Sequence, residues 1–430
     1  MAITWRAVAL TALGTVAVLL VPVAGTVLVW AAVVALACAL DAALAASPRQ
    51  VAVQRSVPAS VRLTQTTRSE LTLTNLGPRR LRAVVRDAWQ PSAGTGPNRH
   101  PVDLPPGEAQ RVRTPLTPTR RGDRRADRAT VRTVGPLGLA GRQVSLDVPA
   151  TLRVLPEFAS RRHLPSRLAR LRELDGRAAV QVRGAGTEFD SLREYVIGDD
   201  VRSIDWRATA RRADVVVRTW RPERDRRVLL VVDTSRTSAV RVEDAPRLDA
   251  SIEAALLLAA LASRAGDRVE LVAYDRRVRA RVAGASGPRL MPAIADALST
   301  VEPTLVETDW PGVVGLVRER LSQRALVVLL SSLEPAAVEQ GLLGVVGQLT
   351  DRHQVVLAAV RDPEVEELRV GRADTAEIFD AAAAERTELE RASVAARLRQ
   401  RGVEVVDALP DELAPRLADT YLALKAAGRL

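Results

Sequence analysis

The 430-residue sequence has one cysteine, Cys38, and only three histidines, His100, His163 and His353. A single cysteine excludes an intrachain disulfide framework and a thiolate metal site. The histidines lie far apart in the sequence, and none has the spacing of a zinc motif. Each is therefore interpreted as a surface or hydrogen-bonded histidine rather than a metal ligand.

Aromatic residues are also scarce, at 3% of the chain, and Lys425 is the only lysine although the formal net charge is +11. The excess of arginine, with heavy use of alanine, valine and leucine, is typical of a GC-rich genome. A nucleic-acid interface needs clustered basic residues or aromatic side chains for stacking, whereas acidic residues are interspersed with the arginines here. The composition therefore favours a chain without a nucleic-acid partner.

Charge is absent from Ala7 to Leu40, a run bounded by Arg6 and Asp41. A helix that crosses the ~30 Å apolar core of a bilayer needs ~20 residues, so the run is too long for one comfortable span and short for two. The stretch 21–25 contains proline and glycine, which favour a break near the middle. We therefore expect residues 1–43 to form a transmembrane hairpin with helices over 4–20 and 23–43.

Two other interpretations of this run stay open. A secretory signal peptide would be cleaved near residue 45, but its apolar region is normally ~7–15 residues long. A single tilted span would place the body outside the cell. However, Arg49, Arg55, Arg62 and Arg68 follow the run, whereas only Arg6 precedes it. This asymmetry favours a multi-pass protein of the cell (inner or plasma) membrane with a cytoplasmic body.

Residues 50–156 have the pattern of a β-rich module. Apolar and polar residues alternate in 51–55, 61–64, 71–75 and 81–85, as in half-buried strands, and turn residues separate these runs. Strands of this length and spacing indicate a small immunoglobulin-like β-sandwich. No residues in it have catalytic spacing, so we interpret it as a spacer or a protein-binding surface.

Residues 159–225 are interpreted as a linker helix followed by a charged segment. Leucines at 164, 168, 171 and 174 recur at helical spacing among arginines, which predicts an amphipathic helix over 159–175. Its basic face is interpreted as solvated, with anionic lipid as the alternative. Beyond residue 184 acids and arginines alternate closely. A salt-bridged network that braces a domain junction is favoured there over a glycosidase-like acid/base pair.

Strands and helices alternate through residues 226–430. Apolar runs predict strands over 228–232, 268–274, 325–330, 354–360 and 403–406. Helices are predicted over 247–265, 289–300, 310–322, 336–350, 381–400 and 411–425. This alternation predicts an α/β, Rossmann-like domain with a doubly wound, mostly parallel sheet, in which sites form at the carboxyl ends of strands.

The first of these strands ends in an Asp-x-Ser-x-Thr sequence, at Asp233, Ser235 and Thr237. This is a close variant of the Asp-x-Ser-x-Ser loop of von Willebrand A-type metal-ion-dependent adhesion sites. Magnesium prefers hard oxygen ligands and keeps waters, so the two hydroxyls can coordinate directly while Asp233 acts through a water. Such sites take a further threonine from a second loop, for which Thr308 is the candidate, with Asp309 beside it. The cofactor of such a site would be Mg²⁺ or Mn²⁺.

The third loop departs from that pattern. An acidic residue is usual after the corresponding strand, but Ser331 and Ser332 follow it here. Loss of the carboxylate weakens a metal site unless Asp309 or Glu334 replaces it. The alternative is a loop that binds no metal.

The charged segment resembles the signature of the bacterial family called "domain of unknown function 58". The layout is also similar: a membrane hairpin, a β module, this signature, and then a von Willebrand factor A-like domain. The resemblance is carried by Glu188, Phe189, Arg193, Tyr195, Gly198, Asp199, Asp200, Arg202, Asp205, Trp206 and Arg211.

Relatives in that family are often paired with MoxR-type AAA+ ATPases. The resemblance therefore implies a membrane-anchored protein-binding or assembly factor, not an enzyme, that acts with such an ATPase. Two rivals stay open. One is a purely structural envelope scaffold. The other is a metal-dependent hydrolase that would use Asp199, Asp200 or Asp205, although a nucleophile–base pair is lacking.

Overall fold

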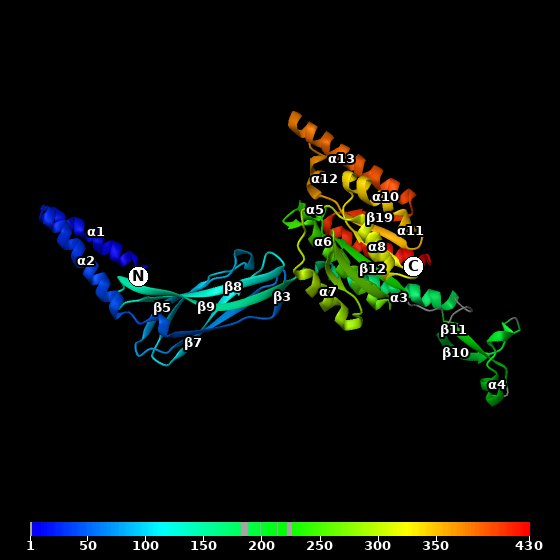
Figure 1. The fold of residues 1–430 in the computed structure, drawn as a ribbon, viewed down its shortest axis with the longest axis horizontal. Coiled ribbons are helices and arrows are strands. Elements are labelled where there is room, and N and C mark those ends of the chain that lie inside the picture. Colours follow the sequence, from blue (N-terminus) through cyan, green and yellow to red (C-terminus); the bar gives the residue numbers. More distant parts are fainter. Residues whose placement is uncertain (1, 182–187, 198, 213, 222–225) are drawn as a thin grey trace. The chain divides into compact units, whose positions relative to one another are not determined.

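The computed structural model describes residues 2–181, 188–197, 199–212, 214–221 and 226–430. The chain forms two compact units, Met1–Glu157 and Phe158–Leu430. Figure 1 shows the first unit in blue and cyan and the second in green to red.

The first unit contains two apolar helices, α1 Trp5–Leu20 and α2 Ala24–Leu44, close to the predicted bounds. By length and composition one helix, over Ala24–Gln50, can cross a membrane, and α1 is a shorter apolar helix. The Trp30 Nε1–H donates to the Leu10 carbonyl at 3.2 Å, and a Cβ added at Gly14 would lie 2.3 Å from the Trp30 ring. The absence of a side chain at Gly14 thus lets α1 and α2 pack closely.

Two sheets make up the rest of this unit. One has the order β1-β9-β8-β5-β6, with β3 parallel to β9, and the other has the order β2-β4-β7. The strands are β1 Ala2–Ile3, β2 Val51–Ser56, β3 Ser60–Arg62, β4 Thr67–Asn75, β5 Leu81–Asp87, β6 Arg99–Leu104, β7 Ala109–Leu116, β8 Gly122–Val134 and β9 Ala140–Leu155, with short turns of helix at η1 Pro48–Gln50 and η2 Pro91–Ala93.

The two sheets share one core. Leu71 and Leu73 of β4 are fully buried with Leu81 and Val85 of β5 and Val131 of β8. A β-rich module is thus confirmed, but its two longest strands, β8 and β9, are missing from the predicted strands. A bulge between Ala126 and Arg128 of β8 shifts their pairing, and such a shift interrupts the period-two alternation that predicts a strand.

The second unit begins with η3 Ala159–His163 and α3 Leu164–Gln181. Helix α3 packs against α6 Arg247–Arg264 and α14 Pro410–Ala426, and Leu171 is buried. Arg167 donates to the Asp419 carboxylate at 2.8 Å. The predicted linker helix therefore belongs to the α/β unit and is fixed to it by both apolar and charged contacts.

The centre of this unit is a six-stranded sheet with the order β16-β15-β12-β17-β18-β19. Its strands are β12 Arg227–Asp233, β15 Arg268–Tyr274, β16 Val278–Val282, β17 Leu326–Leu330, β18 Gln354–Val360 and β19 Val403–Ala408. All neighbours are parallel except β16, which runs antiparallel to β15. Numbered from β12 along the chain, the order is 3-2-1-4-5-6, so the sheet is doubly wound as predicted.

Helices cover both faces of this sheet (Figure 1). Alternate residues of β12 face opposite sides of the sheet. Leu229 and Val231 join a core with residues of α8 Trp310–Arg320, α10 Leu343–Val345, α11 Gly347–Thr350 and α13 Thr375–Gln400. Leu230 and Val232 lie on the other face, where α6 packs against β12. Other elements of this unit are α5 Arg236–Ala239, β13 Arg241–Val242, β14 Ala245–Pro246, η5 Gly287–Arg289, α7 Leu290–Ser299 and α12 Pro363–Leu368.

The predicted helix over 336–350 is present, and it contains a π-helical turn. It consists of α9 Pro335–Ala337, a π-helical turn η6 Val338–Leu342, α10 Leu343–Val345 and α11 Gly347–Thr350. Three glycines fall in this stretch, and glycine costs about 1 kcal/mol in a helix interior relative to alanine. A Cβ at Gly341 would lie 2.4 Å from the Trp310 ring, so packing on that ring also requires glycine here.

Candidate functional site

The candidate metal loop follows the central strand of the α/β domain. Strand β12 is apolar because it is buried between two parallel neighbours, and it ends at Asp233. Asp233, Ser235 and Thr237 are 3%, 1% and 2% exposed. The Asp233 Oδ1 accepts the Ser235 N–H at 2.9 Å, which fixes the turn into α5.

Two further loops bring hydroxyl groups to the same carboxylate. Thr308 Oγ1 donates to Asp233 Oδ1 at 2.9 Å, and Ser331 Oγ donates to Oδ2 at 2.6 Å. Thr237 Oγ1 donates to Oδ2 at 3.3 Å, and Ser235 Oγ lies 3.1 Å from Thr237 Oγ1. We call these five residues the Asp233 cluster. It lies at the carboxyl ends of β12 and β17, where the winding of the sheet reverses and where such folds place ligands.

Asp309 lies outside the Asp233 cluster, although it adjoins Thr308. It caps the N-terminus of α8 by accepting the Gly312 N–H at 3.1 Å, and the Tyr274 hydroxyl hydrogen-bonds to it. Burial raises the pKa of Tyr274, and the Asp309 carboxylate raises it further. The helix start therefore uses the carboxylate that sequence reasoning placed beside a metal.

Arg236 lies between the two loop hydroxyls in the sequence and pairs with acids from both other loops. Its guanidinium binds the Glu307 carboxylate and lies 3.5 Å from the Glu334 carboxylate. The hydrogen bond that Arg236 donates to Glu307, and then the charge of Glu334, raise the pKa of Arg236. Glu334 is thus engaged by Arg236, and Ser331 takes the place beside Asp233 where an acid was expected. Sequence reasoning did not identify Ser331 or Arg236 as members of the site.

The donor set of the Asp233 cluster fits a weakly held magnesium ion. All its side-chain donors are hard oxygens, the kind magnesium prefers, and magnesium sites often use one or two carboxylates plus waters. Only one of the five side chains is charged. In the described part of the chain, no group of three or more His, Cys, Asp or Glu could hold a metal. Any ion here would therefore need further negative charge from outside the cluster.

A second buried carboxylate, Asp275, positions the loop that carries Thr308. It follows β15, is fully buried, and accepts from Thr304 Oγ1 at 2.7 Å and from Arg279 Nε at 2.6 Å. Thr304 N–H in turn donates to the Thr234 carbonyl at 2.8 Å. Burial raises the pKa of Asp275, but hydrogen bonds from Thr304, Arg279 and two backbone N–H groups outweigh it and lower the pKa to about 2.

This lowered pKa predicts an acid sensitivity of the α/β unit. The unfolded value is 3.8, so the contribution of Asp275 is complete above about pH 4 and is lost as the pH falls towards 2. The expected loss is about 2 kcal/mol. Urea unfolding of the full chain in detergent between pH 5 and 2 measures it. Asp275→Asn should flatten this dependence, whereas Asp244→Asn, at a fully exposed residue, should leave it unchanged. Equal slopes for Asp275→Asn and wild type would contradict the assignment.

The family-signature residues form a separate small element. Strand β10 Glu188–Glu194 pairs antiparallel with β11 Val216–Arg221, and η4 Val201–Ser203 and α4 Trp206–Arg212 lie between them. Tyr195 N–H donates to the Val215 carbonyl at 2.7 Å, and Trp206, Arg202 and Arg211 are exposed. Glu188 and Phe189 lie in β10, where the structure describes their backbone alone. Gly198 lies outside the described residues.

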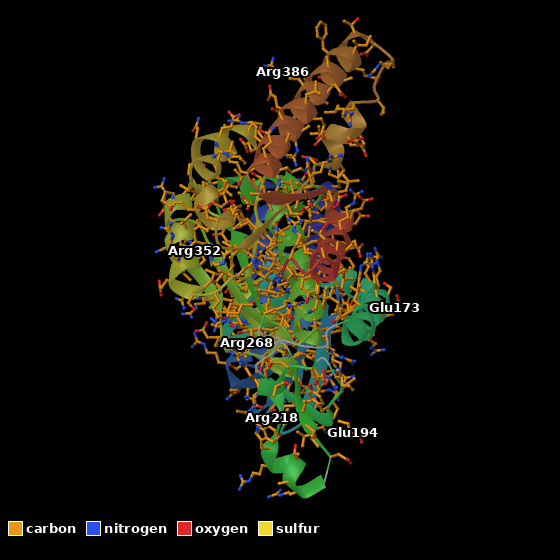
Figure 2. The ribbon with its side chains drawn as sticks, turned by 90° about the vertical axis from the view of Figure 1, so that its right-hand side faces the viewer. Glu173, Glu194, Arg218, Arg268, Arg352 and Arg386 are labelled. Carbon is orange, nitrogen blue, oxygen red and sulfur yellow. The ribbon has the colours of Figure 1, made fainter. Side chains whose placement is uncertain are left out.

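The signature acids pair within this element. Arg193 donates to Asp199 at 2.6 Å, Arg218 donates to Asp205 at 2.8 Å, and Asp200 accepts the Arg202 N–H at 2.9 Å. Arg193 lowers the pKa of Asp199, and the Ala208 N–H and then Arg218 lower that of Asp205. A lowered pKa is the opposite of what a general acid requires. Figure 2 labels Glu194 on β10 and Arg218 on β11.

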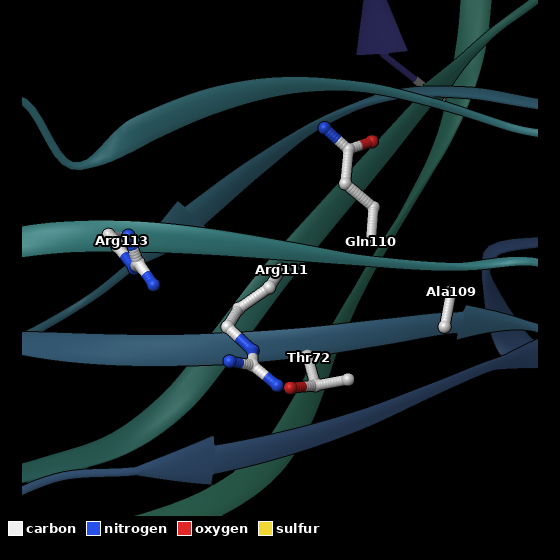
Figure 3. Close-up of a pocket in the computed structure, with 5 residues that line it drawn as sticks. All are labelled: Thr72, Ala109, Gln110, Arg111 and Arg113. Carbon is white, nitrogen blue, oxygen red and sulfur yellow. The ribbon is translucent and has the colours of Figure 1, made fainter.

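Two surface hollows lie away from the predicted site residues. One is shallow and is lined by Thr72, Ala109, Gln110, Arg111 and Arg113 on β4 and β7 (Figure 3). Arg113 and Arg111 approach the same Glu70 carboxylate, at 2.8 and 3.7 Å. The other lies along α13, β19 and α14, where Asp419 already pairs with Arg167. At each hollow, a charged residue of the lining is thus already engaged in an arginine–carboxylate pair.

Residues 191–404 match the family described as "Protein of unknown function DUF58". Uncharacterized proteins of Mycobacterium tuberculosis and Mycobacterium bovis are 27% identical over 189 residues, which span 44% of this chain. The match covers 59% of each relative, so the chain spans about three-fifths of the length of the curated relatives it matches.

Two solved structures that resemble a part of the chain have low TM-scores. The CARDB domain of the PF1109 protein from Pyrococcus furiosus is 21% identical, with a TM-score of 0.19, and the match covers 24% of this chain and 87% of that one. Alpha-2-macroglobulin of Escherichia coli is 18% identical with a TM-score of 0.22, over 25% of this chain and 7% of that one. Neither likeness bears on function.

Proposed function

We propose that the chain is a membrane-anchored protein-binding or assembly factor that acts with a MoxR-type AAA+ ATPase. In this proposal the C-terminal unit is a von Willebrand factor A-like domain, and the Asp233 cluster is its docking site. One observation carries the proposal: three separate loops direct hydroxyl groups at a single buried carboxylate at the switch point of a doubly wound sheet.

The anchor in this proposal is the helical hairpin of α1 and α2. The contact of Trp30 with Gly14 and Leu10 supports two helices that cross the membrane side by side. Both ends of such a hairpin lie on one side of the bilayer. Arginines 49, 55, 62 and 68 follow the apolar run, which supports a cytoplasmic body in a multi-pass protein of the cell membrane.

The docking site in this proposal uses Mg²⁺ or Mn²⁺. Ser235 and Thr237 would coordinate the ion directly, with Asp233 and Thr308 supporting it, and Ser331 orients the carboxylate. When bound, the ion supplies an open coordination position that an acidic side chain of the partner fills. A partner carboxylate would also provide the negative charge that the third loop lacks. Docking and metal binding should therefore strengthen each other.

The test measures metal binding and partner binding on the same full-length chain in lipid nanodiscs. Calorimetry with Mg²⁺ and Mn²⁺ is compared with association of the cognate MoxR-type ATPase, with and without nucleotide. Ser235→Ala combined with Thr237→Val should lower both affinities by at least about tenfold, since the direct ligands are lost. Ser238→Ala is the matched control, because Ser238 is equally buried on α5 but lies outside the Asp233 cluster.

Each outcome separates the parts of the proposal. Loss of metal binding with unchanged ATPase association would move docking to a metal-independent surface. Absence of nucleotide-dependent association in the wild-type chain would contradict a role with such an ATPase and would favour the envelope scaffold instead.

A further inference from the structure

The loop between β8 and β9, residues 135–139, holds the start of helix α1. Ala2 and Ile3 of β1 pair with Gly141 and Ala140 of β9. Thr4 Oγ1 donates to the Gly138 carbonyl at 2.6 Å, and Thr4 N–H donates to the Leu139 carbonyl at 3.0 Å. The residue just before α1 is thus fixed to this loop.

Asp41, close to the end of α2, binds the same loop. Its carboxylate is fully buried and accepts the N–H groups of Leu137, Leu139 and Ala140 at 2.7, 2.7 and 2.9 Å. A Cβ added at Gly135 would lie 2.3 Å from the Asp41 carbonyl oxygen, so the contact needs glycine there. The loop therefore lies at the level where α1 begins and α2 ends.

Helix α1 is too short to cross an apolar layer by itself. Its 16 residues rise about 24 Å, compared with an apolar core of ~30 Å. Apolar surface continues beyond its start, because Ile3, Trp5 and Leu137 are 68%, 74% and 57% exposed. A short span is accommodated when the residues that flank it enter the membrane interface, where tryptophan is favoured. These three side chains can supply the missing length.

Arginines surround this apolar surface. Arg142 Nε donates to the Ala42 carbonyl at 2.9 Å, and Arg79 donates to the Leu44 carbonyl at 3.3 Å. Arg6 is exposed in the first turn of α1. The segments 2–6, 42–46, 76–82 and 134–143 contain no acidic residue. Arginines at this level attract anionic lipid headgroups.

We propose that this end of the β module inserts into the interface of an anionic phospholipid bilayer. Ile3, Trp5 and Leu137 enter the interface, and Arg6, Arg79 and Arg142 bind the headgroups. The inference rests on the proposed membrane hairpin and adds a third membrane contact to its two helices. Because Asp41 and Thr4 fix the loop to both helices, lipid binding sets the depth at which the β module is held.

Depth-dependent quenching of a single fluorescent label tests this inference. The full-length chain is reconstituted in vesicles of phosphatidylcholine and phosphatidylglycerol with an environment-sensitive dye on one cysteine. Native Cys38 in α2 reports the anchor, and Leu137→Cys in a Cys38→Ala background reports the loop. Gln65→Cys is the matched control, because Gln65 is exposed and follows β3 closely in the chain. Strand β3 pairs with the far end of the 16-residue strand β9, about 50 Å along the strand from the end that adjoins residue 137.

Brominated lipids should quench the labels at Cys38 and at 137 and leave the label at 65 unquenched. Cys38 lies three residues before Asp41 on α2, about 4.5 Å along the helix, so its label should be quenched best by bromine placed slightly deeper than the bromine that best quenches 137. At 137, brominated phosphatidylglycerol should quench at least about twofold more than brominated phosphatidylcholine. Substitution of Arg6, Arg79 and Arg142 by glutamine should remove this preference, whereas the same change at Arg111, Arg113 and Arg128 should not.

Quenching at 38 without quenching at 137 would overturn the inference and leave the membrane hairpin in place. Quenching at 137 with no preference for the anionic lipid would overturn headgroup binding. No quenching at 38 would overturn the hairpin itself, and the inference with it.

Discussion

Replacing Arg55 by alanine is expected to lower the free energy of unfolding of the β module by about 3–5 kcal/mol. The side chains of Arg55 and Asp87 are both 0% exposed and pair at 2.7 Å. Arg55 also donates to the carbonyls of Ala126 and Arg128 at 3.2 and 3.1 Å. Its removal leaves the Asp87 carboxylate buried without a cation, which is the main cost.

Urea unfolding of the full chain in detergent, followed by tryptophan fluorescence, measures this loss. The double variant Arg55→Ala, Asp87→Ala should lose less unfolding free energy than the two single variants lose in sum, since it leaves no buried charge unpaired. Arg82→Ala is a control on β5. Arg82 is exposed and its guanidinium lies as far as 3.9 Å from the Asp103 carboxylate, so this substitution should change the free energy of unfolding little. A loss below about 1 kcal/mol for Arg55→Ala would mean that water reaches Asp87.

Continuous apolar runs predicted most strands of the α/β domain, because burial on both faces of the sheet makes these strands apolar throughout. The predicted ranges 268–274 and 354–360 match β15 and β18 residue for residue. The missing β16 is an antiparallel edge strand in which Arg279 and Arg281 interrupt the apolar pattern. Edge strands bury fewer side chains, so composition indicates them weakly.

The candidate site could be predicted only for residues whose contacts follow from their place directly after a predicted strand. Asp233 and Ser235 follow a buried strand, and the loop geometry places them at its end. Thr308 and Asp309 are adjacent, and spacing cannot show that one turns to Asp233 while the other caps α8. Ser331 is the first residue after β17, so the strand register could have identified it, had an acidic residue not been expected.

Asp41 illustrates a different limit. In the sequence it only ends the apolar run, whereas in the structure its carboxylate joins α2 to a loop about 100 residues away. Its three partners are backbone N–H groups, which carry no side-chain signal. Contacts of this kind depend on the fold and cannot be read from residue types.

The second large effect is expected at Asp233. Asp233→Ala should lower the free energy of unfolding of the α/β unit by about 3 kcal/mol, because three hydroxyls and the Ser235 N–H lose their shared acceptor. Asp233→Asn keeps the shape and one acceptor oxygen, so most of the stability should remain. Magnesium affinity should nevertheless fall by about 10–100-fold in Asp233→Asn, since the one charge of the cluster is gone.

These two substitutions separate a structural role of Asp233 from a metal-binding role. Urea unfolding measures the first and calorimetry with Mg²⁺ measures the second, both on the full chain in detergent. If the carboxylate served only to hold the three loops together, Asp233→Asn would keep its stability and leave the heat of Mg²⁺ binding unchanged. If it supports an ion, the same variant loses Mg²⁺ binding while Ser238→Ala retains it. A cluster with one charge that four donors already satisfy can bind a cation only weakly. A partner's carboxylate should therefore raise the apparent Mg²⁺ affinity of the wild-type chain and leave that of Asp233→Asn unchanged.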